Sequence, residues 1–443
     1  MTRARPSGRG KPGRGLGFSE EVSLDVDFLG AQGHGVARLG GEAVYLPGAL
    51  PGETVVARLL GRHGGEVTGR VVRVVNASPH RADPFCPHFG VCGGCALQHL
   101  EPAGYRAWKR DLAVTALARR GLTGVEVEPL AAVPSGSRRR AGFAFIHRAA
   151  GVTLGFFERQ SHRIVDLDDC ALLLPALRSL IAPLRRLLAC VTRPGEGGGV
   201  TVAATGGGVD MIIEAPGPLD LARREALAAF AGERDLARLS WRPGGGSPID
   251  PVVRRRPPQV FPAGVAVDLP PGAFLQPSGE GEALLAARVR DAVGPLSPVA
   301  DLFAGIGSLT FPLATRPETA AHAVEGGGDA VAALAAAARR AGLGNLTTEV
   351  RDLERHPLSG PELSRFAAVV FDPPRAGAKA QAQILAVSGP ALVVAVSCHP
   401  PTFARDARIL VDGGYRLRSV TPVDQFPWSP HLELVAVFRR APV

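Results

Sequence analysis

Long apolar stretches are missing from this chain of 443 residues. No window reaches the ~18 consecutive apolar residues that a membrane-spanning helix needs, so we do not expect a membrane protein. The N-terminus is charged and has no apolar core, which argues against a secretory signal and favours the cytoplasm. Hydrophobic residues make up 46% of the chain and charged residues 21%, which excludes a disordered or fibrous protein overall. The length suggests about three domains.

Positive charge is concentrated at the N-terminus. Residues 1–18 hold five basic and no acidic side chains, out of a net charge of +9 for the chain. This segment is typical of a disordered basic tail suited to a polyanion, and a solvated tail with no specific partner is the alternative. Arginine triplets at 138–140 and 254–256 add further positive charge. Nucleic acid is therefore the leading class of partner, with charge as its only support at this point.

The pattern after the tail predicts a small β-barrel. Residues 22–28 alternate between apolar and polar side chains, as in a half-buried strand. Further β-like runs follow at 43–46, 54–60 and 67–75, and turns rich in glycine and proline separate them. Several short strands at such close spacing indicate an OB-type barrel over residues 19–77, a shape that often binds nucleic acid.

From about residue 280 onward, short apolar runs alternate with helical segments such as 328–341. Continuous apolar runs with helices between them predict a parallel, doubly wound α/β sheet over 266–443. The preceding residues, 78–265, mix strands with helices, among them a predicted helix at 102–120, and indicate a central α+β domain. Ligands bind at the carboxyl ends of the strands in a doubly wound sheet, so the polar residues that end the apolar runs are candidate site residues.

Three acidic residues and two glycines follow these runs in a pattern typical of a nucleotide site. One run ends in Asp301 and turns through Gly305 and Gly307, where glycine lets the backbone approach a ligand closely. A tight turn without a ligand explains this spacing equally well. Glu325 ends the next run, where an acid accepts hydrogen bonds from ribose hydroxyls, and Asp352 ends the third, within reach of an adenine. No lysine follows the glycines, so a phosphate-binding loop is disfavoured.

Six cysteines are present, and three of them, Cys86, Cys92 and Cys95, lie within ten residues. Clustered cysteines without an export signal indicate a metal site rather than disulfides. Cys170 is a candidate fourth ligand, and four thiolates suit either zinc or an iron–sulfur cluster. The paired CxxC spacing of zinc ribbons is absent, and so is the CxxxCxxC spacing of radical enzymes. Cys190 lies on a predicted helix and is interpreted as a core residue.

Four short motifs, in their order along the chain, resemble the RNA uracil-5-methyltransferases that use S-adenosylmethionine: DLFAGIGSLTFPLA, FDPPRAG, VSCHP and HLE. The resemblance extends over about residues 20–440. It implies that the barrel is a TRAM domain and that 266–443 form a class I, Rossmann-like methyltransferase domain. It also implies that Cys86, Cys92 and Cys95, together with the distant Cys170, hold a [4Fe–4S] cluster with a structural or RNA-positioning role. The helix at 102–120 would then pack on the catalytic domain.

The resemblance also implies the chemistry. C5 of uracil is a poor nucleophile, and a thiolate that adds at C6 makes C5 electron-rich enough to accept a methyl group. Cys398 matches the nucleophile, Glu433 the base that removes the C5 proton, and Asp372 a carboxylate that accepts the uracil N3–H. His399 stands where the family usually has asparagine, and we hypothesise that it helps to hold a thiolate. Without the resemblance, a buried structural cysteine and an ordinary strand-edge glutamate are the simpler interpretations.

The positions that match the family's cofactor contacts are Gln276, Phe303, Ser308, Glu325, Asp352 and Asp372. Ser308 replaces the usual asparagine and offers a weaker set of donors. A target base must leave the RNA stack to reach Cys398, and Phe274 is a candidate surface for that base. Arg375 would orient Asp372 or contact an RNA phosphate.

Members of the family that carry a cluster act mostly on 23S ribosomal RNA, so the resemblance implies that substrate, with transfer RNA as the second choice. We expect a monomer. Two other functions stay open. A cytosine-5-methyltransferase also uses a cysteine adduct, but Ser397 rather than a proline precedes Cys398. A catalytically silent RNA-binding protein is disfavoured because Cys398, Asp372 and Glu433 are all present.

Overall fold

The computed structural model describes residues 21–244 and 246–440, apart from the side chain of His63. The predicted basic tail, residues 1–18, lies outside the described residues. Among the described residues, no helix combines the length and apolar character that crossing a membrane requires. The described chain divides into two compact units, residues 21–83 with 96–101, and residues 84–95 with 102–440.

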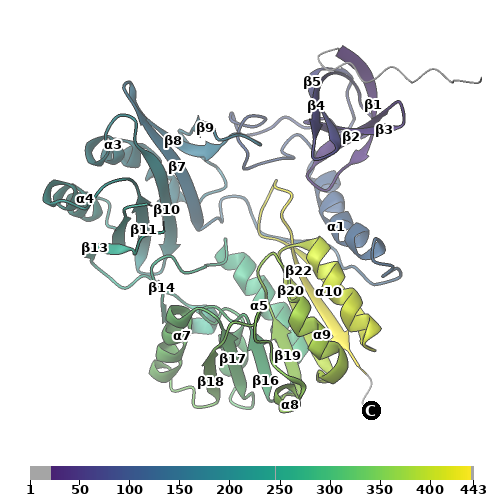
Figure 1. Ribbon diagram of the computed structural model, residues 1–443, viewed down its shortest axis with the longest axis vertical. Coiled ribbons are helices and arrows are strands. Elements are labelled where there is room, and N and C mark those ends of the chain that lie inside the picture. The colour runs from purple at the N-terminus through teal and green to yellow at the C-terminus, as the bar shows by residue number, and fades with distance from the viewer. Residues whose placement is uncertain (1–20, 245, 441–443) are drawn as a thin grey trace, which may run out of the picture. The chain divides into compact units, whose positions relative to one another are not determined.

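The first unit is a closed barrel of five strands, which confirms the predicted N-terminal barrel (Figure 1). The strands are paired in the order β1-β2-β3-β5-β4, with the bounds β1 (Glu21–Leu29), β2 (His34–Leu39), β3 (Glu42–Pro47), β4 (Thr54–His63) and β5 (Glu66–Asn76). Leu24 and Val26 of β1 point inward and pack with Val44 and Val55 in the barrel core. The sequence pattern missed β2 because residues 35–37 are all buried, so that apolar and polar side chains do not alternate there.

The second unit contains an α+β layer built on a sheet of seven strands in the order β13-β12-β11-β10-β7-β8-β9. The bounds are β7 (Arg140–Arg148), β8 (Gly151–Phe157), β9 (Ile164–Asp166), β10 (Gly197–Thr205), β11 (Gly208–Glu214), β12 (Arg238–Arg242) and β13 (Asp250–Arg254), with α2 (Pro175–Arg178), α3 (Ile181–Val191) and α4 (Leu221–Glu233). Ile181, Leu184 and Leu188 of α3 form the apolar stripe of that helix and pack in the core of this layer. Cys190 lies off that stripe and is exposed, so its interpretation as a core residue was wrong.

The rest of the second unit is a sheet of eight strands, and the predicted doubly wound α/β fold is confirmed. The order is β18-β17-β16-β19-β20-β22-β21-β6, and neighbours are parallel except where β22 pairs with β20 and β21. The strands are β6 (Ala131–Ala132), β16 (Val299–Leu302), β17 (Ala321–Glu325), β18 (Leu346–Val350), β19 (Ala368–Phe371), β20 (Leu392–Ser397), β21 (Arg416–Asp424) and β22 (Glu433–Arg439). The helices are α1 (Pro102–Ala118), α5 (Gly279–Val293), α6 (Thr310–Ala314), α7 (Gly328–Arg340), α8 (Gly360–Leu363), α9 (Lys379–Ser388) and α10 (Pro400–Asp412). A short ribbon of β14 (Gln259–Val260) and β15 (Val267–Asp268), with the 3₁₀ turn Pro262–Gly264 between them, precedes α5.

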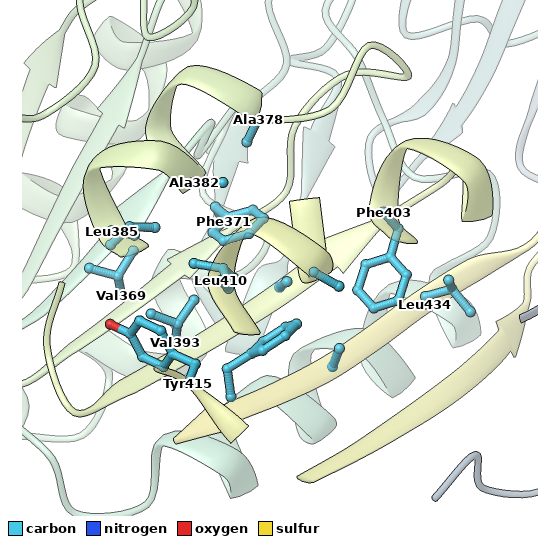
Figure 2. Packing of buried hydrophobic residues seen from close by; sticks show 14 of the residues in the cluster. Val369, Phe371, Ala378, Ala382, Leu385, Val393, Phe403, Leu410, Tyr415 and Leu434 are labelled. Atoms are coloured by element: carbon cyan, nitrogen blue, oxygen red, sulfur yellow. The ribbon is translucent and has the colours of Figure 1, made fainter. Parts of the chain in front are cut away.

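Apolar side chains cover both faces of this sheet, which explains why its strands are nearly continuous apolar runs. On β20, Val393 packs in one cluster with Leu385 of α9 and Leu410 of α10, as Figure 2 shows. The next residue, Val394, packs on the other face with Leu285 of α5. Helix α1 also contributes to the first cluster and contacts α10 and β21. The polar ends of the strands are thereby held at one edge of a rigid sheet.

Candidate active site

The candidate site lies where the parallel strands β16, β17, β19 and β20 end (Figure 1). Cys398 directly follows β20, and Asp372 directly follows β19. Glu433 is the first residue of β22, which runs antiparallel to β20 and pairs Leu434 with Ser397. Because β22 is reversed, its first residue lies at the same edge as the last residues of its parallel neighbours. The fold therefore brings Cys398, Asp372 and Glu433 to one place.

One cavity of about 910 Å³ occupies this edge. Its lining contains ten positions predicted for catalysis, cofactor binding or the target base: Phe274, Gln276, Phe303, Ser308, Glu325, Asp352, Asp372, Arg375, Cys398 and Glu433. A volume of this size suits a nucleoside-containing small molecule.

The loop after β16 forms the floor of the cavity with unusual backbone angles. Phe303, Gly305 and Gly307 have φ values of 61°, 55° and 96°, in the left-handed region that favours glycine. A Cβ atom on Gly307 would lie 2.6 Å from the Phe311 ring, so no other residue fits there without displacing that ring. Phe303, Gly305 and Ser308 of this loop line the cavity.

Glu325 connects two loops through its carboxylate. One carboxylate oxygen accepts a hydrogen bond from Gly305 N at 3.0 Å, and the other accepts from Gly327 N at 2.8 Å. Asp352, two residues beyond the end of β18, accepts from Glu354 N at 3.1 Å. Both acids are thus held at the cavity wall by backbone donors, with lone pairs left for a ligand.

Desolvation controls the protonation of the three candidate catalytic groups. Burial raises the pKa of Asp372 to about 7. Burial, then the carboxylates of Glu433 and Asp372, together raise the pKa of Cys398 to about 12, against the opposing charge of Arg375. The pKa of Glu433 lies well above its usual range because of burial, then because of Asp372, against the opposing charge of Lys109. The thiol of Cys398 is therefore neutral near pH 7, and burial favours the neutral form of the Glu433 carboxyl group.

His399 lies beside this group without being directed at Cys398 by any hydrogen bond that the structure shows. Its Nδ1 is 3.1 Å from Thr402 Oγ1, and burial and Arg375 lower the pKa of its imidazole. The hypothesis that His399 helps to hold a thiolate stays untested. If it does, His399→Asn will shift the thiolate pKa of Cys398, and an unchanged thiolate pKa would remove the idea.

Sequence analysis missed Gln425, which follows β21. Its side-chain amide donates to Gln276 Oε1 at 3.0 Å, and the Gln276 amide in turn is 3.4 Å from Asp372 Oδ2. Gln425 is only 1% exposed. It therefore orients Gln276 toward Asp372, and no motif in the sequence marks it.

Sequence analysis also missed Glu282 and the role of Arg139. The hydroxyl of Ser308 donates to Glu282 on α5, and Arg139 Nη2 donates to the second Glu282 oxygen at 2.9 Å. Arg139 Nε also donates to the Gln276 carbonyl at 2.9 Å. Arg139 belongs to an arginine triplet that sequence analysis related to nucleic acid, yet it points inward and supports two cofactor positions.

Replacing Arg139 with alanine should weaken binding of S-adenosylhomocysteine and lower stability. The Arg139 and Glu282 side chains are 13% and 11% exposed, so the variant would leave a largely desolvated carboxylate with Ser308 as its remaining partner. We expect a loss of about 1–3 kcal/mol in the free energy of unfolding, discounted for partial exposure. Calorimetric titration and thermal melting measure the two effects. Arg139→Met combined with Glu282→Gln should recover most of the stability, and a single variant that binds and melts like the unmodified chain would contradict the role.

Asp301 lies on β16, near the end of the strand, and does not line the cavity. It is buried, accepts from Thr310 Oγ1 at 2.5 Å, and its other oxygen has no hydrogen-bond partner. Burial raises the pKa of Asp301 to about 7, with the charges of Asp372 and Glu325 adding to the effect and Thr310 opposing it. Asp301 is therefore interpreted as a structural acid that keeps its proton below about pH 7.

Asp301→Asn should make stability less dependent on pH. A carboxyl group with a folded pKa of about 7 and an unfolded pKa near 3.9 stabilises the fold fully below about pH 4, and this contribution is lost as the pH rises through 7. The drop in melting temperature from pH 5 to pH 8 should be smaller in the variant, by the equivalent of about 1–4 kcal/mol. Thr310→Ser, which keeps the hydroxyl, serves as the control and should retain the full drop. An equal drop in Asp301→Asn and the unmodified chain would show that Asp301 ionises normally.

The four predicted metal ligands lie in one region without forming a closed site. Among the residues that the structure describes, no three His, Cys, Asp or Glu side chains form a group that could hold a metal ion. Burial raises the pKa of Cys170, and the nearby Cys92 and Cys86 thiols raise it further. Burial likewise raises the pKa of Cys92, to which Cys86 adds. The four cysteines therefore have the chemistry of metal ligands, and their thiols are close enough to affect one another's pKa. Their side chains do not converge on one point as the ligands of a metal ion would.

The cysteine loop is anchored to the central sheet. Cys92 forms a β-bridge with Glu158, and Arg159 Nη2 donates to the Cys95 carbonyl at 2.8 Å. Arg138 and Arg159 both lie near the thiols and oppose negative charge on them. Two partly buried arginines beside four cysteines would offset the charge of a thiolate-bound group.

The sheet order with one antiparallel strand, together with the glycine-lined cavity at the strand ends, defines a class I methyltransferase dependent on S-adenosylmethionine. A solved structure of Pyrococcus abyssi tRNA (uracil-54, C5)-methyltransferase in complex with S-adenosyl-L-homocysteine shares the fold. Its TM-score is 0.71 at 21% identity, over 94% of this chain and 100% of that chain.

Sequence comparison gives the family. An uncharacterized RNA methyltransferase of Rhizobium meliloti is 43% identical over 425 residues, covering 94% of this chain and 99% of the relative. The 23S rRNA (uracil(1939)-C(5))-methyltransferase RlmD of Alkalilimnicola ehrlichii is 35% identical over 435 residues, covering 95% of this chain and 97% of the relative. Residues 336–441 match the tRNA (Uracil-5-)-methyltransferase family, and residues 20–72 match the TRAM domain. The chain belongs to the RNA (uracil-C5)-methyltransferase family, as its motifs indicated.

Proposed function

We propose that this RNA (uracil-C5)-methyltransferase acts on 23S ribosomal RNA, with Cys398 as nucleophile and Glu433 as the base that removes the C5 proton. The observation that carries the catalytic assignment is the convergence of Cys398, Glu433 and Asp372 on the cavity that contains the cofactor positions. The choice of RNA is supported by the RlmD relative, whose name gives 23S rRNA as its substrate.

The residues present fit S-adenosylmethionine. The Glu325 carboxylate would accept hydrogen bonds from the ribose hydroxyls, and Asp352 would lie beside the adenine. Gln276, with the backbone of Phe303 and the hydroxyl of Ser308, would hold the methionine end near Asp372. When bound, S-adenosylmethionine supplies an electrophilic methyl group and leaves as S-adenosylhomocysteine with the electron pair of the broken carbon–sulfur bond. Beside a positive sulfonium, Cys398 and Glu433 would lose their protons more readily than without that charge.

Two residues would perform the covalent steps. The Cys398 thiolate would form a bond to C6 of uracil, and the C5=C6 electron pair would move toward O4 and C5. C5 would then take the methyl group. The Glu433 carboxylate would remove the C5 proton, the released electron pair would restore the C5=C6 bond, and the bond from Cys398 to C6 would break. Asp372 would accept the N3–H and so hold the ring between nucleophile and methyl donor.

Phe274 would hold a base that has left the RNA stack. Its ring is 64% exposed at the cavity, and the Arg140 guanidinium carbon is 5.5 Å from the ring centroid. An exposed aromatic ring next to an arginine is a suitable stacking surface for an unstacked base and its phosphate.

The direct test is methylation in vitro. The purified protein is incubated with S-adenosylmethionine and either a 23S rRNA transcript or transfer RNA, and the nucleosides are identified by mass spectrometry. We expect 5-methyluridine in the 23S transcript. Modification of transfer RNA alone would overturn the choice of RNA, 5-methylcytidine would assign a cytosine enzyme, and binding without modification would leave an RNA-binding protein.

We further propose that Cys86, Cys92, Cys95 and Cys170 bind a [4Fe–4S] cluster that fixes the cysteine loop to β8. The support is the donor set of four neighbouring cysteines with two nearby arginines, and the missing zinc-ribbon spacing. Anaerobically purified protein should contain about four irons and four sulfides per chain. Cys170→Ser should lose them, whereas the exposed Cys190→Ser should not. Stoichiometric zinc in place of iron would overturn the cluster. The monomeric state and the cytoplasmic location stay predictions.

A further inference from the structure

A buried lysine on α1 contacts the segment that leads into Glu433. Lys109 is 0% exposed, which is rare for a lysine, because a charged ammonium group loses its hydration there. Its Nζ donates to Asp424 Oδ1 at 2.8 Å and to the Phe426 carbonyl at 3.4 Å, and also to the His431 carbonyl. One side chain thus holds both ends of the connection between β21 and β22.

Asp424, the partner of Lys109, accepts further hydrogen bonds. Its carboxylate also accepts from Tyr105 Oη at 2.5 Å and from Phe426 N at 3.0 Å, and it is 1% exposed. Tyr105 Oη accepts in turn from Trp428 N at 2.7 Å. Trp428 has a φ of 66°, a strained value for a side chain with a Cβ, which surrounding contacts must maintain. Helix α1 therefore fixes the conformation of this connection.

The same connection touches the reacting groups in two ways. Its second residue, Gln425, orients Gln276 toward Asp372, as described above. Its end is Glu433, which interacts electrostatically with Asp372 after β19, with Cys398 after β20 and with Lys109 on α1. Lys109 in turn faces Asp424, Glu433 and His431. Of the charged groups that act on Glu433, Asp372 favours its neutral form and Lys109 favours its carboxylate.

We propose that Lys109 is a positioning residue for the proton-removing step: its ammonium group holds the Asp424–Glu433 connection and stabilises the carboxylate of Glu433 against Asp372. This inference rests on the proposed role of Glu433. A base must be deprotonated before it can act, and two neighbouring acids repel each other's charge. A cation near Glu433 meets that need without occupying the cavity, since Lys109 does not line it.

The test measures the pH dependence of proton removal. In single turnovers, the release of methylated RNA from the covalent adduct is followed from pH 6 to pH 9. Lys109→Met should move the acidic limb of this profile to higher pH by at least about half a unit. At a pH below the limb, this shift corresponds to about a threefold lower rate. The variant Lys109→Met/Asp424→Asn removes both buried charges together and should be easier to fold, with the same direction of shift. Tyr105→Phe, which weakens the same network but keeps the ammonium group, is the matched control and should leave the limb in place.

The outcomes separate this inference from the function on which it rests. If the unmodified enzyme forms no adduct and no 5-methyluridine, the proposed function fails. If it does both, but the limb of either folded lysine variant coincides with that of the unmodified enzyme, the role of Lys109 is overturned. A loss of rate at all pH values equally, shared by Tyr105→Phe, would show a purely structural contact and would overturn it as well.

Discussion

Cys398→Ala should abolish methylation of uridine, by at least about 10⁴-fold, while the protein still binds S-adenosylhomocysteine. In the proposed mechanism the Cys398 thiol supplies the bond to C6 that makes C5 reactive, and alanine offers no substitute. Its removal also takes away a neutral, half-buried group rather than a charge, so the fold should survive. The rate is measured by transfer of labelled methyl groups to the RNA, and cofactor binding by calorimetry.

Trapping makes this result specific. RNA that contains 5-fluorouridine should form a stable adduct with the unmodified enzyme in the presence of S-adenosylmethionine, because the fluorine on C5 cannot leave as a proton does. The adduct should be absent from Cys398→Ala and present in Cys190→Ala, whose cysteine is exposed on α3. An adduct that persists without Cys398 would assign the nucleophile to another residue.

Glu433→Gln should arrest the reaction after methyl transfer. Glutamine keeps the shape of the side chain but cannot accept the C5 proton, so the bond between Cys398 and C6 cannot break. We expect product release to fall by about 10²–10⁴-fold. Ordinary uridine RNA, without fluorine, should then remain attached to the denatured protein and carry the new methyl group.

Electrophoresis under denaturing conditions and mass spectrometry of the digested complex detect this species. The double variant Cys398→Ala/Glu433→Gln is the control and should show no complex. If Glu433→Gln turns over normally, another base removes the proton. If it forms an adduct without the methyl group, Glu433 acts before methyl transfer rather than after it.

The sequence predicted the parts of the site that depend on strand ends. Buried parallel strands are read as apolar runs, so the residues that follow them, such as Glu325, Asp372 and Cys398, could be placed at one edge before the structure was known. The structure puts all the predicted catalytic and cofactor positions around one cavity. Their roles stay predictions.

The supporting residues could not be predicted, because their partners are distant in sequence. Lys109 and Asp424 are separated by 315 positions, and Arg139 and Glu282 by 143. A lysine on a helix or an arginine in a basic triplet suggests a solvated surface, and only tertiary packing turns these groups inward. The prediction for Cys190 was wrong in the opposite direction. Its apolar helix segment suggested that it is buried, but the residue lies off the packed stripe of α3 and is exposed.

The reversed strand β22 has a consequence for damaged copies of the protein. A chain that kept Cys398 but lost Glu433 would attach itself to RNA and stay there, a harmful product. Because β22 lies between β20 and β21, a chain cut before Glu433 also lacks an interior strand, and two hydrophobic strand edges are left open. Such a fragment should misfold and be degraded rather than occupy RNA. The topology thus couples the loss of Glu433, the proposed base, to the loss of the fold that presents Cys398.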